Sequence, residues 1–303
     1  MSVCPFVISA RREHRIGQGV MQMNCAWQTY LNILPHWMRS DVDAFGRMTL
    51  QELRLRIGLP PELILKANSV WLKRAVGVED LQFIINCASQ YSPWLSTTMA
   101  EGYLTAPGGH RIGICGTAVI DNQRMRGIRE PTSLCIRVAR DFPNIAEDPL
   151  LLNGSVLILG PPGSGKTTFL RDLIRQRSRQ GTGSISVVDE RGELFPAINR
   201  DLFFPGPRTD VLRFCGKGQG ITAVLKTMGP SCIAVDEITD QQDCLALQQA
   251  GCCGVSVLAT VHAWNLDDLF KRPLYRNLIE SKLFDNLVVM GLDKSWKVET
   301  VPL

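Results

Sequence analysis

The chain reads Gly160-Pro161-Pro162-Gly163-Ser164-Gly165-Lys166-Thr167, which satisfies the phosphate-loop pattern G-x-x-x-x-G-K-[ST] at every fixed position. An apolar run at 156–159 precedes this loop and predicts a buried strand, and apolar residues at helical spacing follow it. In such a unit, successive backbone N–H groups wrap a polyphosphate at the N-terminus of the helix, where the helix dipole favours an anion. A dinucleotide loop is excluded because Thr168 stands where G-x-G-x-x-G needs its last glycine. We therefore expect an ATP or GTP site.

The residues expected to contact the nucleotide run through the loop into the first turn of the helix. They are Gly160, Pro161, Pro162, Gly163, Ser164, Gly165, Lys166, Thr167 and Thr168. Lys166 is expected to place its ammonium between the outer phosphates, and Thr167 to bind Mg²⁺ through its hydroxyl.

Polar residues follow three further apolar runs. Asp236 and Glu237 end the run 232–235, Asp189 and Glu190 end the run 185–188, and His262 ends the run 255–261. Parallel strands deliver the residues at their carboxyl ends to one edge of the sheet. We expect Asp236 to help hold Mg²⁺, Glu237 to polarise the attacking water, and His262 to sense the terminal phosphate.

Continuous Val/Ile/Leu runs that alternate with helices predict a parallel sheet buried on both faces. The predicted organisation is a poorly ordered tail over residues 1–30, a small α+β domain over 31–145 and an α/β phosphate-loop NTPase domain over 150–303. Within the first domain, the alternation at 53–57 predicts a strand, and helical spacing predicts a helix over 78–89. The short runs 102–106, 112–120 and 133–139 predict further strands around turns.

Composition excludes several classes of protein. A hydrophobic share of 45% with 20% charged residues excludes disorder, collagen and coiled coils. The net charge of +4 is too small to indicate a nucleic-acid binder by itself. Ten cysteines without a Cys-x-x-Cys pair, and only four histidines, argue against a zinc site and favour a reducing compartment. Charged residues interrupt the first nineteen residues, so no signal peptide is expected and the predicted location is cytoplasmic.

Several blocks of the sequence resemble one particular family, that of stage III sporulation protein AA, whose members are ATPases related to those of type II and type IV secretion. The similar blocks cover residues 52–58, 102–111, 133–140, the phosphate loop, 188–191, 208–212 and 235–238, and the resemblance extends over residues 33–301. It implies a RecA-like domain that binds ATP and Mg²⁺ and hydrolyses ATP. It also implies a homo-oligomer, expected to be a hexameric ring, that is recruited peripherally to a membrane-embedded partner complex during endospore formation.

The same resemblance implies roles for single residues. Asp189-Glu190 falls at the acidic box of the secretion ATPases, and residues 259–262 fall at their histidine box. Glu190 therefore competes with Glu237 for the role of catalytic base, and the sequence leaves both open. Secretion ATPases use arginines of the N-terminal domain on a neighbouring subunit's nucleotide, which makes Arg137 and Arg140 candidates here. These two belong to a segment, 111–140, that holds six arginines against two acidic residues.

Two other functions remain as alternatives to a motor ATPase. A nucleic-acid-dependent ATPase or translocase would use the same nucleotide core, but segment 111–140 contains no aromatic residue to stack on bases. The sequence therefore argues against nucleic acid as a partner. A small-molecule kinase would need an acceptor pocket and has no use for Glu237 beside Asp236. The four arginines late in the helix after the phosphate loop (Arg171, Arg175, Arg177 and Arg179) are interpreted as favourable charges at the helix C-terminus.

Overall fold

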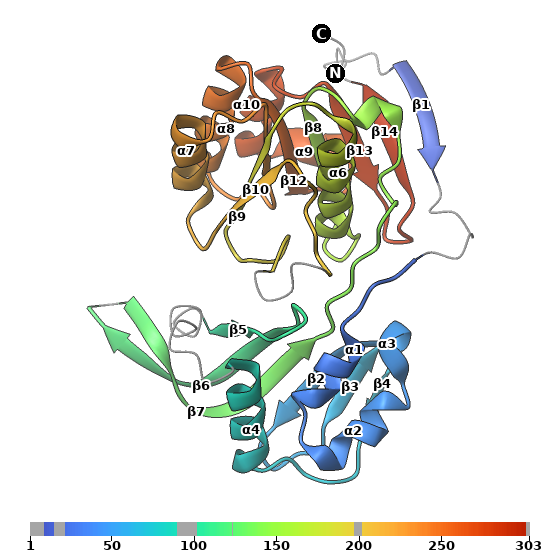
Figure 1. Ribbon diagram of the computed structural model, residues 1–303, viewed down its shortest axis with the longest axis vertical. Helices are drawn as coiled ribbons and strands as arrows, with labels where there is room; N and C mark the ends of the chain where they lie inside the picture. The colour runs from blue at the N-terminus through green and yellow to red at the C-terminus, as the bar shows by residue number, and fades with distance from the viewer. Residues whose placement is uncertain (1–8, 15–21, 90–101, 123, 197–201, 301–303) are drawn as a thin grey trace. The chain divides into compact units, whose positions relative to one another are not determined.

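The computed structural model of the protein describes residues 9–14, 22–89, 102–122, 124–196 and 202–300. The chain divides into two compact units (Figure 1). The first unit consists of Met23–Asp141 with Pro196–Leu202, and the second of Met1–Gln22, Phe142–Phe195 and Phe203–Leu303.

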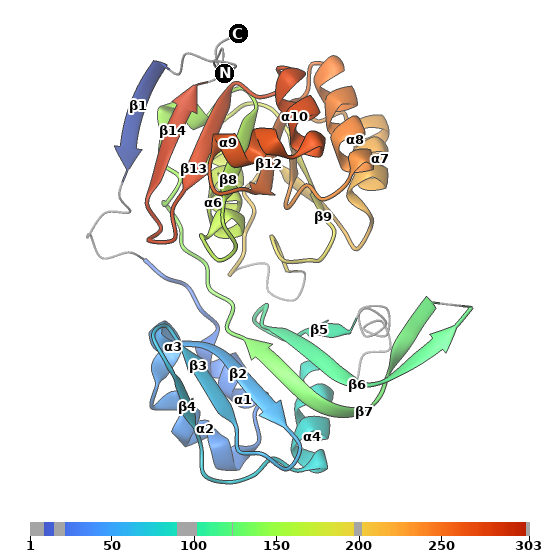
Figure 2. The same cartoon turned by 180° about the vertical axis from the view of Figure 1, so that it is seen from behind.

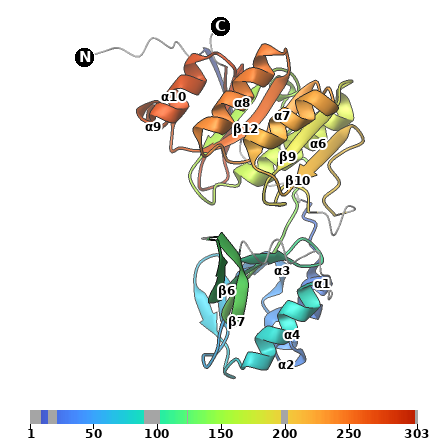
Figure 3. The same ribbon diagram turned by 90° about the vertical axis from the view of Figure 1, so that its left-hand side faces the viewer.

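The unit formed by Met23–Asp141 is an antiparallel sheet with helices packed on it. Its strand order is β4-β3-β2-β7-β6-β5. The strands are β2 (Leu50–Arg56), β3 (Glu62–Leu65), β4 (Ser69–Trp71), β5 (Tyr103–Thr105), β6 (Arg111–Asp121) and β7 (Arg124–Arg137). The helices are α1 (Trp27–Asn32), α2 (His36–Asp43), α3 (Gly46–Thr49) and α4 (Val78–Ser89). Figure 3 shows α1, α2 and α4 on one side of this sheet. The alternation that predicted a strand places Leu53 and Leu55 in the core, fully buried.

The second unit is built on a mixed, largely parallel sheet of eight strands in the order β1-β14-β13-β8-β12-β11-β9-β10. The six strands from β13 to β10 are mutually parallel, and β14 and β1 add antiparallel pairs at one edge. Their bounds are β8 (Val156–Gly160), β9 (Ile185–Asp189), β10 (Thr209–Arg213), β11 (Cys232–Val235), β12 (Ser256–His262), β13 (Asn286–Met290), β14 (Trp296–Thr300) and β1 (Ser9–His14).

Helices cover both faces of this sheet, which explains why its central strands are buried and mostly apolar. Figures 1 and 2 show α6 (Lys166–Gln180) on one face and α9 (Leu266–Lys271) and α10 (Pro273–Glu280) on the other. Helices α7 (Lys217–Thr227) and α8 (Gln241–Cys252) share a hydrophobic core with β8, β9, β11 and β12. Every residue of β8, β9 and β11 is buried. In the described ranges, no helix has both the length and the apolar character needed to cross a bilayer.

The structure differs from the sequence prediction at the N-terminus and in the sheet. Within the predicted tail of residues 1–30, Ser9–His14 form β1 on the edge of β14, and α1 begins at Trp27. Tyr30 is fully buried, so the first unit begins earlier than residue 31. The predicted sheet was parallel, whereas β14 runs antiparallel to β13, because the short connection 291–295 can join only antiparallel neighbours, and β1 pairs antiparallel with β14.

Candidate functional site

The phosphate loop joins β8 to α6 in a conformation that needs glycine at two positions. A Cβ atom on Gly160 would lie 2.6 Å from the Ser164 Oγ and 2.9 Å from the Met290 carbonyl oxygen. Gly165, directly before α6, has a φ of 101°, in the left-handed region that L side chains rarely adopt. The loop therefore keeps the open, backbone-lined form that a polyphosphate requires at a helix N-terminus.

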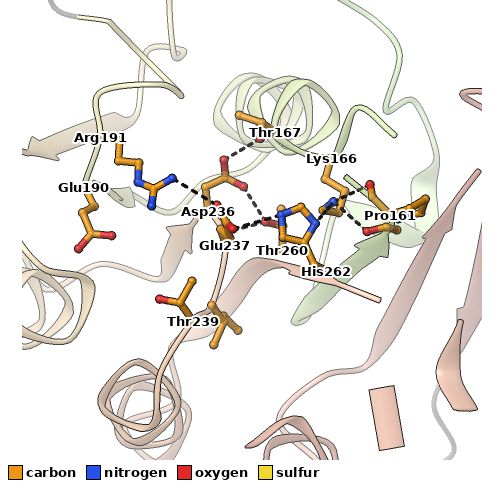
Figure 4. Close-up of polar contacts among 12 residues, drawn as sticks. Pro161, Lys166, Thr167, Glu190, Arg191, Asp236, Glu237, Thr239, Thr260 and His262 are labelled. Atoms are coloured by element: carbon orange, nitrogen blue, oxygen red, sulfur yellow. Dashed lines mark hydrogen bonds and ion pairs between the residues drawn. The ribbon is translucent and has the colours of Figure 1, made fainter. Parts of the chain in front are cut away.

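The Lys166 side chain folds back over its own loop (Figure 4). Its Nζ donates to the carbonyl oxygens of Gly160, at 2.8 Å, and Pro161, at 3.0 Å, and lies 2.8 Å from the His262 Nδ1. The residue is only 6% exposed. Burial lowers the pKa of Lys166, and the carboxylates of Asp236 and Glu237 oppose that shift. An anion in the loop would compete with these carbonyls for the ammonium.

His262 connects Lys166 to Glu237. Because an ammonium can only donate, the His262 Nδ1 accepts from Lys166, which places the ring hydrogen on Nε2. That Nε2 lies 3.1 Å from the Glu237 Oε1 and donates to it. The imidazole thus joins the phosphate-loop lysine at one nitrogen and a candidate catalytic carboxylate at the other.

Asp236 is fixed by two hydroxyl groups. The Thr167 Oγ1 donates to its Oδ2 at 2.7 Å, and the Thr260 Oγ1 donates to its Oδ1 at 2.6 Å. The Thr260 oxygen also accepts from the Glu237 backbone N–H at 2.8 Å. These bonds tie α6, the end of β11 and β12 together around one carboxylate, as Figure 4 shows.

Glu237 adopts a backbone conformation that is uncommon for a residue with a side chain, with φ at +53°. Its carboxylate is partly exposed and lies 3.7 Å from an Arg191 guanidinium nitrogen at Oε2, in addition to the His262 contact. Left-handed residues of this kind cluster at functional sites, where the surrounding structure holds them in place. The conformation aims the carboxylate toward His262 and Arg191.

Asp189 and Glu190 are neighbours in sequence with different environments. Asp189 is 3% exposed and accepts from the backbone N–H groups of Glu193 and Phe195, both at 2.9 Å. Burial raises the pKa of Asp189, and hydrogen bonds from the backbone of Phe195 and Leu194 oppose that shift. Asp189 therefore shapes its own loop, which leaves Glu190 as the carboxylate of this pair that can act in a reaction.

The Glu190 carboxylate lies at a small hollow that Asp236 and Glu237 also line. The hollow measures about 30 Å³, room for about two water molecules. Its lining includes Asp189, Glu190, Arg191, Glu193, Lys217, Asp236, Glu237 and Thr239. Both candidate bases therefore border one space in which water can sit.

The remaining loop residues predicted to contact nucleotide surround the same place. Pro161 is buried, whereas Pro162 and Gly163 are exposed at the tip of the loop. Thr168 lies half-buried in the first turn of α6. The Ser164 Oγ is buried and has no hydrogen-bond partner among the described residues.

Arg137 and Arg140 lie in the other unit, at and just beyond the end of β7. The Arg137 Nε donates to the Glu52 Oε1 at 3.1 Å, and its side chain is 61% exposed. The Arg140 guanidinium donates to the backbone carbonyls of Arg47, at 2.8 Å, and Leu50. Burial lowers the pKa of Arg140. Arg140 thus holds its own unit together, and Arg137 presents an exposed guanidinium.

The interpretation of the arginines in α6 as favourable charges at the helix C-terminus does not account for three of them. Arg171, Arg175 and Arg177 are 3–6% exposed. Each donates to backbone carbonyls of a different segment. Arg171 donates to those of Glu193 and Leu194, and Arg175 to that of Phe204. Arg177 donates to the carbonyls of Leu151, Asn153 and Gly154. The helix that leaves the phosphate loop therefore anchors the loop after Asp189 and the segment entering β8.

Sequence reasoning missed four polar residues at this site. They are Thr260, Arg191, Lys217 and Lys294, whose Nζ donates to the Gly163 carbonyl. Two of them left a signal: Arg191 follows Asp189 and Glu190 in a block that resembles the family, and Thr260 precedes the end of the run that His262 closes. Thr260 and His262 are two residues apart in a strand and so share a face.

These residues fit a magnesium–nucleotide complex. The orphaned Ser164 hydroxyl and the glycine-lined loop offer partners to phosphate oxygens. Thr167 supplies one hydroxyl and Asp236 one carboxylate. A Mg²⁺ ion beside phosphates usually has only a few protein ligands of this kind. The described residues contain no cluster of three or more His, Cys, Asp or Glu that would hold a metal ion by itself.

Comparison with solved structures shows which fold the chain shares with known proteins. The ATPase DotB of Legionella pneumophila superposes with a TM-score of 0.57 at 17% identity, over 84% of this chain and 76% of DotB. The pilus retraction motor PilT, solved with bound ADP, superposes with a TM-score of 0.58 at 15% identity, over 82% of this chain and 76% of PilT. The predicted RecA-like α/β fold is thereby confirmed.

Sequence comparison gives the family. The Stage III sporulation protein AA of Bacillus subtilis (strain 168) is 37% identical over 278 residues, which cover 86% of this chain and 90% of that protein. The type IV pilus assembly ATPase TfpB of Acinetobacter baylyi is 27% identical over 41% of this chain and 22% of its own length. The profile of the family "Sporulation stage III, protein AA" matches residues 31–300. The chain therefore belongs to the sporulation stage III protein AA family, as its sequence blocks predicted.

Proposed function

We propose that the chain is a magnesium-dependent ATPase of the motor type, which energises assembly or export by a membrane complex during endospore formation. The observation that carries this proposal is the convergence of the phosphate-loop Lys166 and Thr167 with Asp236, Glu237 and His262. The ADP bound in the similarly folded PilT supports an adenine nucleotide. The name of the Bacillus subtilis relative supports the sporulation setting.

In the proposed reaction, each residue has a separate task. Lys166 and the loop N–H groups hold the outer phosphates, and Thr167 and Asp236 hold Mg²⁺. When bound, the metal would neutralise charge that develops on the phosphates. Glu237 orients the attacking water and takes up its proton, Glu190 helps to align that water, and His262 keeps Glu237 directed toward the phosphate.

The proposed assembly is a homo-oligomer, expected to be a hexameric ring, that works with a membrane-embedded partner. Arg137 is proposed to complete the nucleotide site of a neighbouring subunit, because it presents an exposed guanidinium. Arg140 is the weaker candidate, since its donors are used by backbone carbonyls within its own unit. The proposed location is the cytoplasm, with peripheral recruitment by the partner.

The test is phosphate release from ATP by the purified chain, with and without Mg²⁺. Metal-dependent release of phosphate from ATP is expected, with little change on adding single-stranded DNA or RNA. Stimulation of more than several-fold by nucleic acid would favour a translocase instead. Failure to bind labelled adenine or guanine nucleotides with Mg²⁺ present would exclude the proposed function.

A further inference from the structure

Lys217, the first residue of α7, is a charged side chain in an unusual place. It is 6% exposed and lies in the first helical turn, where the helix dipole disfavours a cation. Burying an ammonium costs free energy unless it is paired. Helix stability therefore gives no reason for a lysine here, and the reason has to be sought in its contacts.

Two carboxylates from different segments pair with Lys217. Its Nζ lies 2.6 Å from the Glu190 Oε2, beyond the end of β9, and 3.6 Å from the Asp243 Oδ2, in the first turn of α8. Asp243 is 3% exposed and Glu190 is partly exposed. The buried ammonium is thus held by a buried carboxylate on one side and reaches the candidate catalytic carboxylate on the other.

Asp243 connects this pair to the turn that follows β11. The Asp243 Oδ2 accepts from the Thr239 backbone N–H at 3.1 Å and from its hydroxyl at 3.4 Å. Thr239 stands three residues after Asp236 and lines the same hollow as Glu190 and Lys217. A chain of polar contacts therefore runs from Glu190 through Lys217 and Asp243 to the segment that carries the other two carboxylates of the site.

We infer that Lys217 is a positioning residue for hydrolysis, which holds the Glu190 carboxylate at the hollow it shares with Asp236 and Glu237. This inference rests on the proposed ATPase function. The ion pairs of Lys217 are with Glu190 and Asp243, so it is inferred to act through Glu190 and not on the phosphates.

The test is a double-mutant cycle of Lys217→Met with Glu190→Gln, measured as kcat and KM for ATP and as the Kd of a fluorescent ATP analogue with Mg²⁺. Lys217→Met is expected to lower kcat by about 10- to 100-fold, as for a misplaced reacting group, and to leave the Kd within about threefold. In the Glu190→Gln background, the same substitution should change kcat by no more than about twofold, because residues that act as a unit are non-additive.

Two controls keep the result interpretable. Lys226→Met removes the same charge from the exposed end of α7 and should leave kcat unchanged. Lys217→Met leaves the buried Asp243 without its cation, so Lys217→Met with Asp243→Asn is made as well. That pair should fold, judged by thermal unfolding, and reproduce the kcat of Lys217→Met.

The outcomes that would contradict the positioning role differ from those that would contradict the ATPase function. Losses in kcat that multiply across the cycle, full activity of Glu190→Gln, or a weakened Kd with unchanged kcat would each overturn the positioning role and leave the ATPase function intact. A wild-type chain that binds no nucleotide and releases no phosphate would overturn the ATPase function, and this inference with it.

Discussion

The Lys166 Nζ lies 2.8 Å from the His262 Nδ1, so the lysine of the phosphate loop and the histidine at the end of β12 are hydrogen-bonded to each other. Through the Nε2 of the same ring, the contact continues to Glu237. A phosphate that draws Lys166 away from His262 would therefore alter the hydrogen bond that His262 donates to Glu237. Through this ring, phosphate binding at Lys166 could change the orientation of the Glu237 carboxylate.

Lys166→Ala is expected to abolish detectable turnover, a loss of at least about 10²-fold in kcat, because it removes the charge placed against the outer phosphates. Steady-state phosphate release from ATP measures the effect. Lys271→Ala, at the exposed end of α9, removes a comparable charge from the same unit and should keep wild-type turnover. Retained activity in Lys166→Ala would contradict the assignment of the loop.

Glu237→Gln is expected to bind ATP with Mg²⁺ as the wild type does and to turn over about 10²- to 10⁴-fold more slowly, because an amide cannot accept the proton of the attacking water. The amide oxygen can still accept from His262, so the local contacts are kept. Binding of a fluorescent analogue and single-turnover hydrolysis separate the two steps. Normal turnover here, with a large loss in Glu190→Gln, would transfer the role of base to Glu190.

The strands of the second unit were predictable where burial on both faces made them mostly apolar. The strands β8, β9, β11 and β12 were found in this way. β14 was missed because it contains Lys297 and Glu299, yet Glu299 is buried and lies 2.6 Å from the Lys297 Nζ. β1 was missed because its pairing with β14 joins segments more than 280 residues apart, and such pairing leaves no local pattern.

The candidate site was predictable in its motif residues and not in its supporting contacts. The loop pattern and strand-end acids identify Lys166, Thr167, Asp236 and Glu237 from the sequence. Lys217 could not be found, because its partner Glu190 is 27 residues away and the two meet only in the folded chain. The buried arginines of α6 were misassigned since their positions also suit a helix C-terminus, and only the tertiary structure shows which carbonyls they reach.

Thr260→Val is expected to lower both activity and stability, although the two side chains have similar shapes. The substitution removes the hydroxyl that donates to Asp236 and accepts from the Glu237 N–H. Leaving those groups without this partner should cost about 1–3 kcal/mol of unfolding free energy and reduce kcat by about tenfold or more. Chemical denaturation and phosphate release measure the two effects.

Thr260→Ser is the matched control, because it keeps the hydroxyl and loses a methyl group. It should retain most of the activity and stability that the valine variant loses. If the serine variant is as impaired as the valine variant, packing of the methyl group, and not the hydrogen bonds, accounts for the effect.

Arg137→Ala is expected to affect turnover, and Arg140→Ala is expected to affect stability. Arg137 is exposed and paired with Glu52, an interaction worth little at a surface, so its removal should leave the unfolding free energy unchanged and lower kcat in the assembled oligomer by about 10³-fold or more. Arg140 holds the carbonyls of Arg47 and Leu50, so its removal should destabilise the first unit by about 1–3 kcal/mol. Thermal unfolding and turnover, each measured over a range of protein concentration, distinguish the two.

Arg126→Ala is the matched control. It removes an exposed arginine of the same strand β7 that pairs with Asp121, and it should change neither the unfolding free energy nor kcat. Loss of turnover in Arg126→Ala equal to that in Arg137→Ala would indicate a general effect of positive charge on this strand and would exclude a specific role for Arg137 in a neighbouring site.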